Sequence, residues 1–297
     1  MRVLITGASG LIGEALQKSF TEKGYEMLLA SRKEPGDGQD IQWDVETGFA
    51  EPEKLEGIDA VVHLAGENLS GFRWTEEKKK AIIDSRVLGT RNVVDAISKL
   101  QKKPKVFIAS SAIGFYGDRG EDEVSESSSA GNNFLADVCK AWESESRRAE
   151  DAGIRTVLLR TGIVLSKGGG ALAAMLTPFR LGVGGVVGSG KQWMSWISLD
   201  DHVSVVNFAV ENETLRGAVN SVSPHAVTNQ EFTKTLGEVL YRPTIIPLPE
   251  FAVSMIFGEM GDELLLASTK VVPRRLLDAG FEFKYPDLKP AIEHAIE

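Results

Sequence analysis

Three glycines near the start of the chain have the types and spacing of a phosphate-binding turn. Gly7, Gly10 and Gly13 follow Thr6 in the order T-G-x-x-G-x-x-G. The first glycine allows a tight turn, the second lets a pyrophosphate approach the backbone, and the third lets a helix pack close to a strand. A helix that begins here offers free N–H groups and the positive end of its dipole to phosphate oxygens. The expected contacts in this turn are Gly7, Ser9, Gly10, Leu11, Ile12 and Gly13.

The segments on either side of the glycines fit a strand and a helix. Residues 2–6 (RVLIT) form a short apolar run typical of a buried parallel strand. Apolar residues at helical spacing follow, at Leu11, Ile12, Ala15, Leu16 and Phe20. Because strand, turn and helix occur in this order, we expect the turn to bind a dinucleotide; the alternative is a glycine-rich turn without a ligand.

The end of the second expected strand indicates which dinucleotide. Residues 25–30 (YEMLLA) predict this strand, and Arg32 and Lys33 follow it with no acid at the strand end. In dinucleotide folds an acid here binds the ribose 2′-hydroxyl of NAD, whereas an arginine accommodates the 2′-phosphate of NADP. A guanidinium matches a phosphate in charge and in forked geometry, so we expect NADP(H). The alternative is a pair of solvated surface cations.

Strand and helix patterns alternate along the rest of the first half. Strands are expected at residues 39–44, 58–65, 105–110 and 153–165, and long helices at 75–100, with Thr75 as N-cap, and at 134–152. This alternation predicts an α/β fold, a Rossmann-type doubly wound parallel sheet, over residues 1–165. A smaller discontinuous lobe, residues 166–297, is expected to complete the pocket for a small-molecule substrate. A segment near residues 193–225 is expected to return to the sheet.

Composition excludes several kinds of partner. The chain has 297 residues, enough for a large core, and its net charge of -9 argues against nucleic acid and anionic membrane surfaces. No apolar run has transmembrane length. We also expect no metal site. The single cysteine, Cys139, excludes an internal disulfide framework and suits a reducing compartment. Because the first strand begins at residue 2, no signal peptide is expected, and the predicted location is cytoplasmic.

Several motifs resemble one family along essentially the full chain. The glycine turn resembles the extended short-chain dehydrogenase/reductase superfamily, the group of sugar-nucleotide epimerases and dehydratases. An uncharacterised epimerase-like branch, which ends in a small C-terminal domain of unknown function (here from about residue 245), is similar at H63-L-A-G-E67, R73-W74, S85-R86 and W142-E143. Further cofactor contacts implied by the resemblance are Asp44, Leu64, Ala65, Gly66, Glu67, Arg86, Ser110, Lys140 and Arg160.

The superfamily's usual catalytic pair is incomplete here. In Tyr-x-x-x-Lys the lysine holds the nicotinamide ribose and lowers the tyrosine's pKa, so that the phenol can exchange a proton with substrate. Lys140 stands at the lysine position, but Ala136, four residues earlier, has no proton to give. Ser111 and Tyr116, in a segment that resembles the family's S-S-x-x-x-Y-G, are the other expected catalytic residues. Weaker substitutes for the tyrosine are Glu67, Asp118 and Asp137.

The resemblance implies an NADP(H)-dependent oxidoreductase or epimerase-type enzyme, acting on a sugar nucleotide or a small carbonyl compound. Because the tyrosine is missing, the alternative is a catalytically silent NADP(H)-binding protein that reports cofactor state to a partner. The superfamily commonly forms homodimers through its two long helices, here residues 75–100 and 134–152. The apolar faces of these helices would equally suit packing on the sheet.

The remaining segments have less specific patterns. Residues 118–133, acidic and then rich in serine and glycine, predict a mobile surface loop. Asp200 is expected to cap a helix over residues 201–210, and His63 to be a satisfied core histidine. The glycines at 168–170 and 182–190 suit either a substrate diphosphate or ordinary connections.

Overall fold

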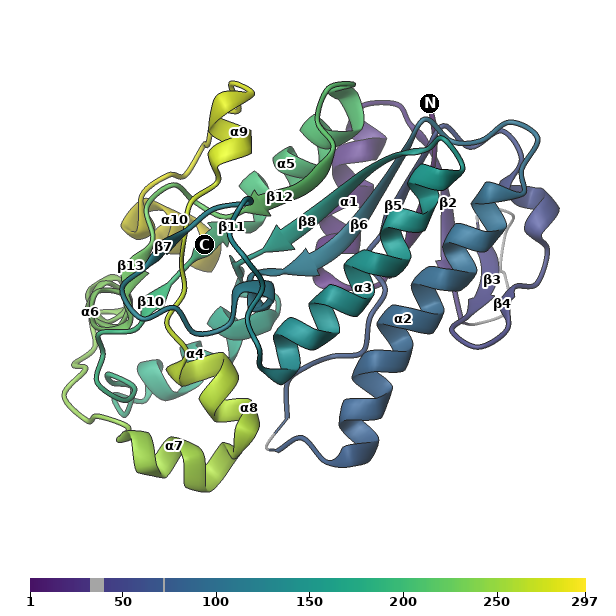
Figure 1. The fold of residues 1–297 in the computed structure, drawn as a ribbon. Helices are drawn as coiled ribbons and strands as arrows, with labels where there is room; N and C mark the ends of the chain where they lie inside the picture. Colours follow the sequence, from purple (N-terminus) through teal and green to yellow (C-terminus); the bar gives the residue numbers. More distant parts are fainter. Residues whose placement is uncertain (33–39, 72) are drawn as a thin grey trace.

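An eight-stranded sheet forms the centre of the protein (Figure 1). The structure is a computed structural model and describes residues 1–32, 40–71 and 73–297. The strand order is β12-β8-β6-β5-β1-β2-β3-β4, and only β4 at the edge runs antiparallel to its neighbour. The strands are β1 (Arg2–Thr6), β2 (Glu26–Ser31), β3 (Asp40–Asp44), β4 (Gly48–Phe49), β5 (Ala60–His63), β6 (Val106–Ala112), β8 (Arg155–Thr161) and β12 (Gly217–Ser221).

The order in which successive strands join the sheet reverses between β1 and β5. The chain first builds outward from β1 through β2 and β3, and then continues on the other side of β1 with β5, β6, β8 and β12. The carboxyl ends of β1 and β5 therefore mark the topological switch point, where open α/β sheets bind their ligands. This arrangement confirms the Rossmann-type parallel sheet expected from the sequence.

Helices cover both faces of the sheet, as Figure 1 shows. Helix α1 (Leu11–Glu22) lies with α5 (Leu199–Glu211) on one face, and α2 (Glu76–Ser98) lies with α3 (Phe134–Asp151) on the other. Alternate strand residues divide between the two layers: Val3 and Ile5 pack with the α1 face, and Leu4 packs with the α2 face. Burial on both faces explains why these strands read as continuous apolar runs.

Side-chain caps begin most of the long helices. Thr75 accepts a hydrogen bond from Lys78 N at 3.2 Å before α2, as expected, and Asn133 accepts one from Ala136 N at 3.1 Å before α3. Ser198, rather than Asp200, caps α5 by accepting from Asp201 N at 3.0 Å. The prediction for Asp200 was wrong because the helix begins two residues earlier than its apolar pattern suggested; Asp200 instead lies 3.1 Å from His294.

A second group of elements packs around Trp196. Residues 153–165 form two strands, β8 and β9, rather than the single strand predicted. Gly162 lies between them, where a Cβ would be 2.5 Å from the Ser195 carbonyl oxygen. The elements of this lobe include β9 (Ile163–Leu165), α4 (Gly170–Arg180), β10 (Trp193–Met194), β11 (Trp196–Ser198), β13 (Val227–Thr228), α6 (Asn229–Leu240) and α10 (Leu288–Ile296).

The C-terminal segment crosses back to the first half of the chain. It contains α7 (Glu250–Phe257), α8 (Glu259–Gly261), a π-helical turn η3 (Asp262–Leu266), β14 (Lys270–Val271) and α9 (Arg274–Asp278). Strand β14 pairs with β7 (Glu123–Val124), and Arg119 N donates to the Ser268 carbonyl at 2.7 Å. Residues 118–133 form a loop, as predicted, except at β7, and strand pairing and backbone hydrogen bonds hold this loop against the C-terminal segment. The predicted mobility of the loop stays a prediction.

The short 3₁₀ turns η1 (Pro52–Leu55) and η2 (Ile113–Tyr116) complete the described elements. Across α2 and α3, Arg91 pairs with Glu145 and Arg148 with Asp95. The homodimer expected through these two helices stays a prediction. In the described parts of the chain no helix combines the length and apolar character that a membrane span requires.

Candidate functional site

The glycine turn after β1 is shaped by close backbone approaches. Gly7 has a φ of +72°, and a Cβ there would lie 2.9 Å from Ala65 N, in the turn after β5. A Cβ on Gly13 would lie 2.4 Å from the Gly7 carbonyl oxygen. Gly10 differs, because it is exposed and an added Cβ would meet only Gly7 O, at 3.3 Å. Gly7 and Gly13 therefore permit the close backbone contacts of the turn, whereas the main chain at Gly10 remains exposed.

Helix α1 starts at this turn without a cap. Its N-cap residue is Gly10, and no side chain bonds to its first N–H groups. Ser9 is exposed, and Leu11 and Ile12 are half-buried beside these groups. An uncapped helix start at a switch point suits a phosphate, since the dipole and the free donors act together.

A buried histidine fixes the two turns relative to each other. Thr6 Oγ1 lies 2.6 Å from His63 Nδ1 and accepts from Ala65 N at 3.3 Å. His63 Nε2 lies 3.0 Å from the hydroxyl of Thr90. Burial lowers the pKa of His63 to about 3, so the ring stays neutral. The expected core role of His63 is confirmed.

The adenosine side of the predicted site includes the cation of Arg32. Arg32 is exposed directly after β2, and in the portion of the chain described here no carboxylate pairs with it. Lys33, its predicted companion, lies outside the described residues. Asp44 ends β3 and accepts from the backbone N–H groups of Glu46 and Thr47 at 2.8 and 3.1 Å, which lowers its pKa.

The turn after β5 is held against α2. Glu67 N donates to Ser85 Oγ at 2.9 Å, and Arg86 Nη1 donates to the Glu67 carbonyl at 3.0 Å. The Glu67 carboxylate pairs with Lys78 at 2.6 Å. Residues 64–67 are thus held in place next to the glycine turn, and their expected contact with a cofactor stays a prediction.

Two of the predicted catalytic residues belong to a buried network at the ends of β6 and β8. Ser111 Oγ donates to Glu143 Oε1 at 2.8 Å, and Arg160 donates to both oxygens of Glu143 at 2.7 and 2.9 Å. Arg160 Nη1 also donates to the Tyr116 hydroxyl at 3.1 Å, and that hydroxyl donates to Asn220 Oδ1 at 2.6 Å. The network joins five elements of the fold: β6, η2, α3, β8 and β12.

Burial makes this network unsuitable for proton exchange with a ligand. Tyr116 is 0% exposed and Ser111 4% exposed. Burial raises the pKa of Tyr116, although the bonds from Arg160 and to Asn220 act in the opposite direction. Arg160 uses its whole guanidinium within the network and is 3% exposed, which gives no support to its predicted cofactor contact. Ser110, next to Ser111, is half-buried.

Lys140 lies away from this network. Its ammonium is 2.6 Å from Asp137 and 3.5 Å from the Gly131 carbonyl oxygen, on the exposed face of α3. The preceding residue, Cys139, points inward, with Sγ 3.8 Å from the Ala112 carbonyl oxygen. Burial raises the pKa of the Cys139 thiol to about 11, so the thiol is inert. The position of Lys140 therefore gives no support to its expected contact with a nicotinamide ribose.

Sequence reasoning missed the partners that organise the network. Glu143 was noticed only as part of the W142-E143 motif, and Asn220 gave no signal. The three weaker acid candidates are also engaged: Asp118 accepts from Gly120 N and Ser268 N at 3.0 and 3.1 Å, Asp137 pairs with Lys140, and Glu67 pairs with Lys78.

The C-terminal segment contacts the first half of the chain beside this site. The Glu263 carboxylate accepts from Phe134 N and Leu135 N at 3.0 and 2.9 Å, at the start of α3. Arg73 donates to the Met255 and Ile256 carbonyls, and Lys79 pairs with Glu259. Through these contacts the C-terminal segment that contains α7, α8 and η3 packs against the loop before α2 and against the start of α3.

Two glycine segments of the second half have different surroundings. Cβ atoms built on Gly168 and Gly169 would lie 3.4 and 3.7 Å from the Leu11 side chain, so this loop lies beside the start of α1. The segment 182–190 pairs instead with the chain before α7, where Gly188 N donates to the Leu248 carbonyl at 2.8 Å. Only the first of these segments adjoins the candidate site.

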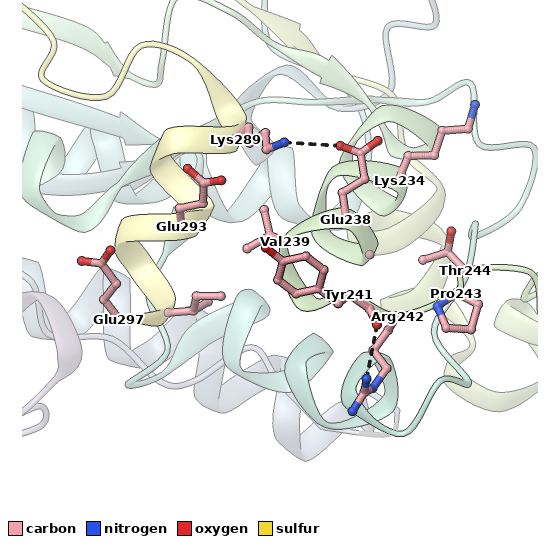
Figure 2. A pocket seen from close by; sticks show the side chains of 12 residues that line it. Lys234, Glu238, Val239, Tyr241, Arg242, Pro243, Thr244, Lys289, Glu293 and Glu297 are labelled. Atoms are coloured by element: carbon pink, nitrogen blue, oxygen red, sulfur yellow. Dashed lines mark hydrogen bonds and ion pairs between the residues drawn. The ribbon is translucent and has the colours of Figure 1, made fainter.

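Two hollows accompany these elements. One, of about 290 Å³, lies beside η2 and is lined by Tyr116, Arg119 and Asn132, among others. A larger groove of about 920 Å³ lies between α6 and α10, with Glu238 3.7 Å from Lys289 and an exposed Tyr241 (Figure 2). The larger groove is built from the C-terminal lobe alone and contains none of the residues predicted to bind a cofactor. Among the described residues, no cluster of three or more side chains suits a metal ion.

Comparisons with known proteins agree with the fold described above. A model of the NAD dependent epimerase/dehydratase family matches residues 3–220, and a model of a domain of unknown function, DUF1731, matches residues 248–295. An epimerase family protein of Mycobacterium tuberculosis is 40% identical over 293 residues, covering 99% of this chain and 97% of that protein. Epimerase family protein SDR39U1 of Homo sapiens is 38% identical over 299 residues, covering 100% of both chains. The crystal structure of human SDR39U1 (isoform 2) with NADPH is similar with a TM-score of 0.92 and 37% identity, again over both full chains.

Proposed function

The chain belongs to the NAD-dependent epimerase/dehydratase family, and from that premise we propose that it is an NADP(H)-dependent enzyme of the oxidoreductase or epimerase type. The observation that carries the proposal is the uncapped start of α1 at the switch point, directly after Gly7 and Gly10. The similarity to human SDR39U1, whose structure contains NADPH, supports the choice of dinucleotide.

The residues present fit such a cofactor. The N–H groups at the start of α1 would hold the diphosphate, Arg32 the 2′-phosphate, and Asp44 would lie towards the adenine. The turn at residues 64–67 would line the centre of the site. When bound, the nicotinamide supplies or accepts a hydride. The substrate in this proposal is a sugar nucleotide or a small carbonyl compound, bound where the C-terminal lobe meets the edge of the sheet.

Ser111, Tyr116 and Arg160 act in this proposal as positioning residues. Their bonds to Glu143 and Asn220 fix the ends of β6, β8 and β12 beside the site. A proton that accompanies hydride transfer is then exchanged with water or with a residue outside the network, because the phenol of Tyr116 has no exposed surface.

The test of cofactor choice is a calorimetric titration of the protein with NADPH and, separately, with NADH. We expect NADPH to bind at least about 10-fold more tightly, because a guanidinium–phosphate contact contributes about 1.5–3 kcal/mol. Arg32→Ala should remove most of that preference. A suitable control is Arg216→Ala, since Arg216 is another exposed arginine but precedes β12 at the opposite edge of the sheet. Equal affinity for the two dinucleotides would contradict the assignment of NADP(H).

One observation favours the alternative, a catalytically silent NADP(H)-binding protein. Tyr116, expected near the reacting oxygen, is enclosed, and Lys140, expected on the nicotinamide ribose, lies on the exposed face of α3 and pairs with Asp137. Two incubations separate the two functions: NADPH carrying deuterium at C4 with a panel of aldehydes and ketones, and NADP⁺ with a panel of sugar nucleotides. Deuterium in a reduced product, or a new sugar epimer, supports the enzyme, whereas tight NADPH binding with neither product supports the silent protein.

A further inference from the structure

Arg86, on α2, is a buried arginine that forms no ion pair with a carboxylate among the described residues. It is 9% exposed, and in the parts of the chain that the structure describes no carboxylate oxygen lies within ion-pair distance. Its Nη1 donates to the carbonyls of Glu67 and Ile82 at 3.0 and 3.2 Å. The nearby Glu67 carboxylate is already paired with Lys78. Burial lowers the pKa of Arg86, yet a guanidinium remains charged in proteins, so a positive charge is enclosed here without its counter-charge.

One edge of this guanidinium is unused. Every hydrogen bond of Arg86 within the described chain comes from Nη1, which leaves Nη2 and Nε without an acceptor. Neither atom is among the fully enclosed polar atoms that lack a partner, so both keep some accessible surface. A Cβ on the exposed residue Gly66 would lie 3.2 Å from Arg86 Cζ and 3.3 Å from Nη2. The glycine after β5 thus leaves the guanidinium uncovered at the switch point.

Arg155 provides a comparison for Arg86, because its hydrogen bonds give it a structural role. It also lacks a carboxylate partner within the described chain, but its Nη1 donates to the Ala209 and Leu215 carbonyls at 3.0 and 2.8 Å. Its Nη2 donates to the Val210 carbonyl at 3.2 Å. Arg155 lies at the amino end of β8, away from the site. Both of its terminal nitrogens are used there, in contrast to Arg86.

Arg86 lies against side chains of α3. Trp142 on α3 lies under its guanidinium, with Cζ 5.0 Å from the ring centroid, and the charge of Arg86 acts on the neighbouring Cys139. Lys140, the cation expected on α3, points to the exposed face. We propose that Arg86 supplies the positive charge of the site on the β5–β6 side of the switch point, and that its free edge receives an oxyanion.

The forked geometry of the guanidinium suits a group with two adjacent oxygens, such as a phosphate or a carboxylate. This inference rests on the proposed function, since the oxyanion is taken to belong either to the dinucleotide or to a substrate bound beside it. The two sources share one chemistry and are separable by experiment.

The test compares wild-type protein with Arg86→Gln, Arg86→Lys and the control Arg155→Gln in fluorescence titrations. The probes are NADPH, 2′,5′-ADP, which lacks the nicotinamide half, and malonate added to protein loaded with NADP⁺. If the oxyanion belongs to the cofactor, Arg86→Gln should weaken NADPH binding about 10- to 100-fold and leave 2′,5′-ADP binding unchanged. If it belongs to the substrate, both nucleotides should bind normally, while malonate should bind the wild-type protein and not Arg86→Gln.

Arg86→Lys keeps a charge but loses the fork, and we expect it to lose at least about 5-fold in whichever affinity depends on Arg86. This variant decides the question if Arg86→Gln does not fold. Arg155→Gln should lower the melting temperature and leave all three affinities unchanged. Wild-type affinities for every probe in the folded Arg86 variants would overturn the inference about Arg86 alone. Failure of the wild-type protein to bind NADPH would instead overturn the proposed function.

Discussion

The glycine turn after β1 and the ends of β6 and β8 lie along the same edge of the sheet, but their polar groups are used in opposite ways. At the turn, α1 begins without a side-chain cap and Gly10 is exposed. At β6 and β8, Ser111 and Arg160 are enclosed and bonded through Glu143. One region offers free donors to a ligand, and the other satisfies its polar groups within the protein.

This difference shows which part of the family's site is retained when key side chains are replaced. The binding region depends on backbone geometry, which glycines at fixed spacing preserve. The residues expected to carry proton chemistry act through side chains, and two of them, Ser111 and Tyr116, here stabilise the junction of β6, β8 and β12. A fold can therefore keep its cofactor region while the residues expected to be catalytic become part of the interior.

The largest expected effect comes from breaking the buried network. Glu143→Ala leaves Arg160 enclosed without its counter-charge, so the free energy of unfolding should fall by about 3–5 kcal/mol. Urea denaturation followed by circular dichroism measures this loss. The matched control is Glu145→Ala, two residues further along α3, whose pairs with Arg91 and Arg148 lie at the surface. That variant should lose about 1 kcal/mol or less, and equal losses in the two variants would contradict the special role of Glu143.

A second pair of variants separates folding from binding within the glycine turn. Gly13→Ala places a Cβ 2.4 Å from the Gly7 carbonyl oxygen, so it should cost about 1–3 kcal/mol of stability and abolish NADPH binding. Gly10→Ala adds a methyl group that meets only one backbone atom, so its melting temperature should equal that of the wild type. We expect Gly10→Ala to weaken NADPH binding about 10-fold by obstructing the diphosphate, which calorimetry would detect. Unchanged affinity would show that no ligand approaches Gly10.

The smallest expected effect concerns the hydroxyl of Tyr116. Tyr116→Phe removes the group that lies between Asn220 and Arg160, which should lower the free energy of unfolding by about 1–2 kcal/mol. NADPH affinity should stay within about twofold of the wild-type value. The opposite pattern, full stability with weakened NADPH binding, would place the hydroxyl in the ligand site and remove the contrast between the two regions.

The turn could be predicted from sequence because its constraints are local. The positive φ of Gly7 and the close approach of Gly13 to Gly7 involve residues within one segment, so their spacing already expresses the geometry. The alternating apolar runs likewise predicted β1 without error, and α2 with its cap Thr75 to within two residues, because burial on both faces of a parallel sheet leaves a clear pattern.

The side-chain environments could not be predicted because they depend on distant partners and on helix register. The Tyr116 hydroxyl is held by Asn220, which is 104 residues further along the chain. On α3, consecutive residues point about 100° apart, so a difference of one position exchanges an exposed Lys140 for an inward Cys139. The sixth expected strand breaks at Gly162, beside the Ser195 carbonyl oxygen, a contact that no local pattern reveals.

The most direct test of the contrast between the two regions is a crystal structure of the protein with NADPH. We predict the diphosphate against the backbone N–H groups at the start of α1, with the 2′-phosphate beside Arg32. The Tyr116 hydroxyl should remain between Asn220 and Arg160, as it is without a ligand. A dinucleotide bound elsewhere, or a Tyr116 side chain turned out of the network to face the nicotinamide, would contradict the account.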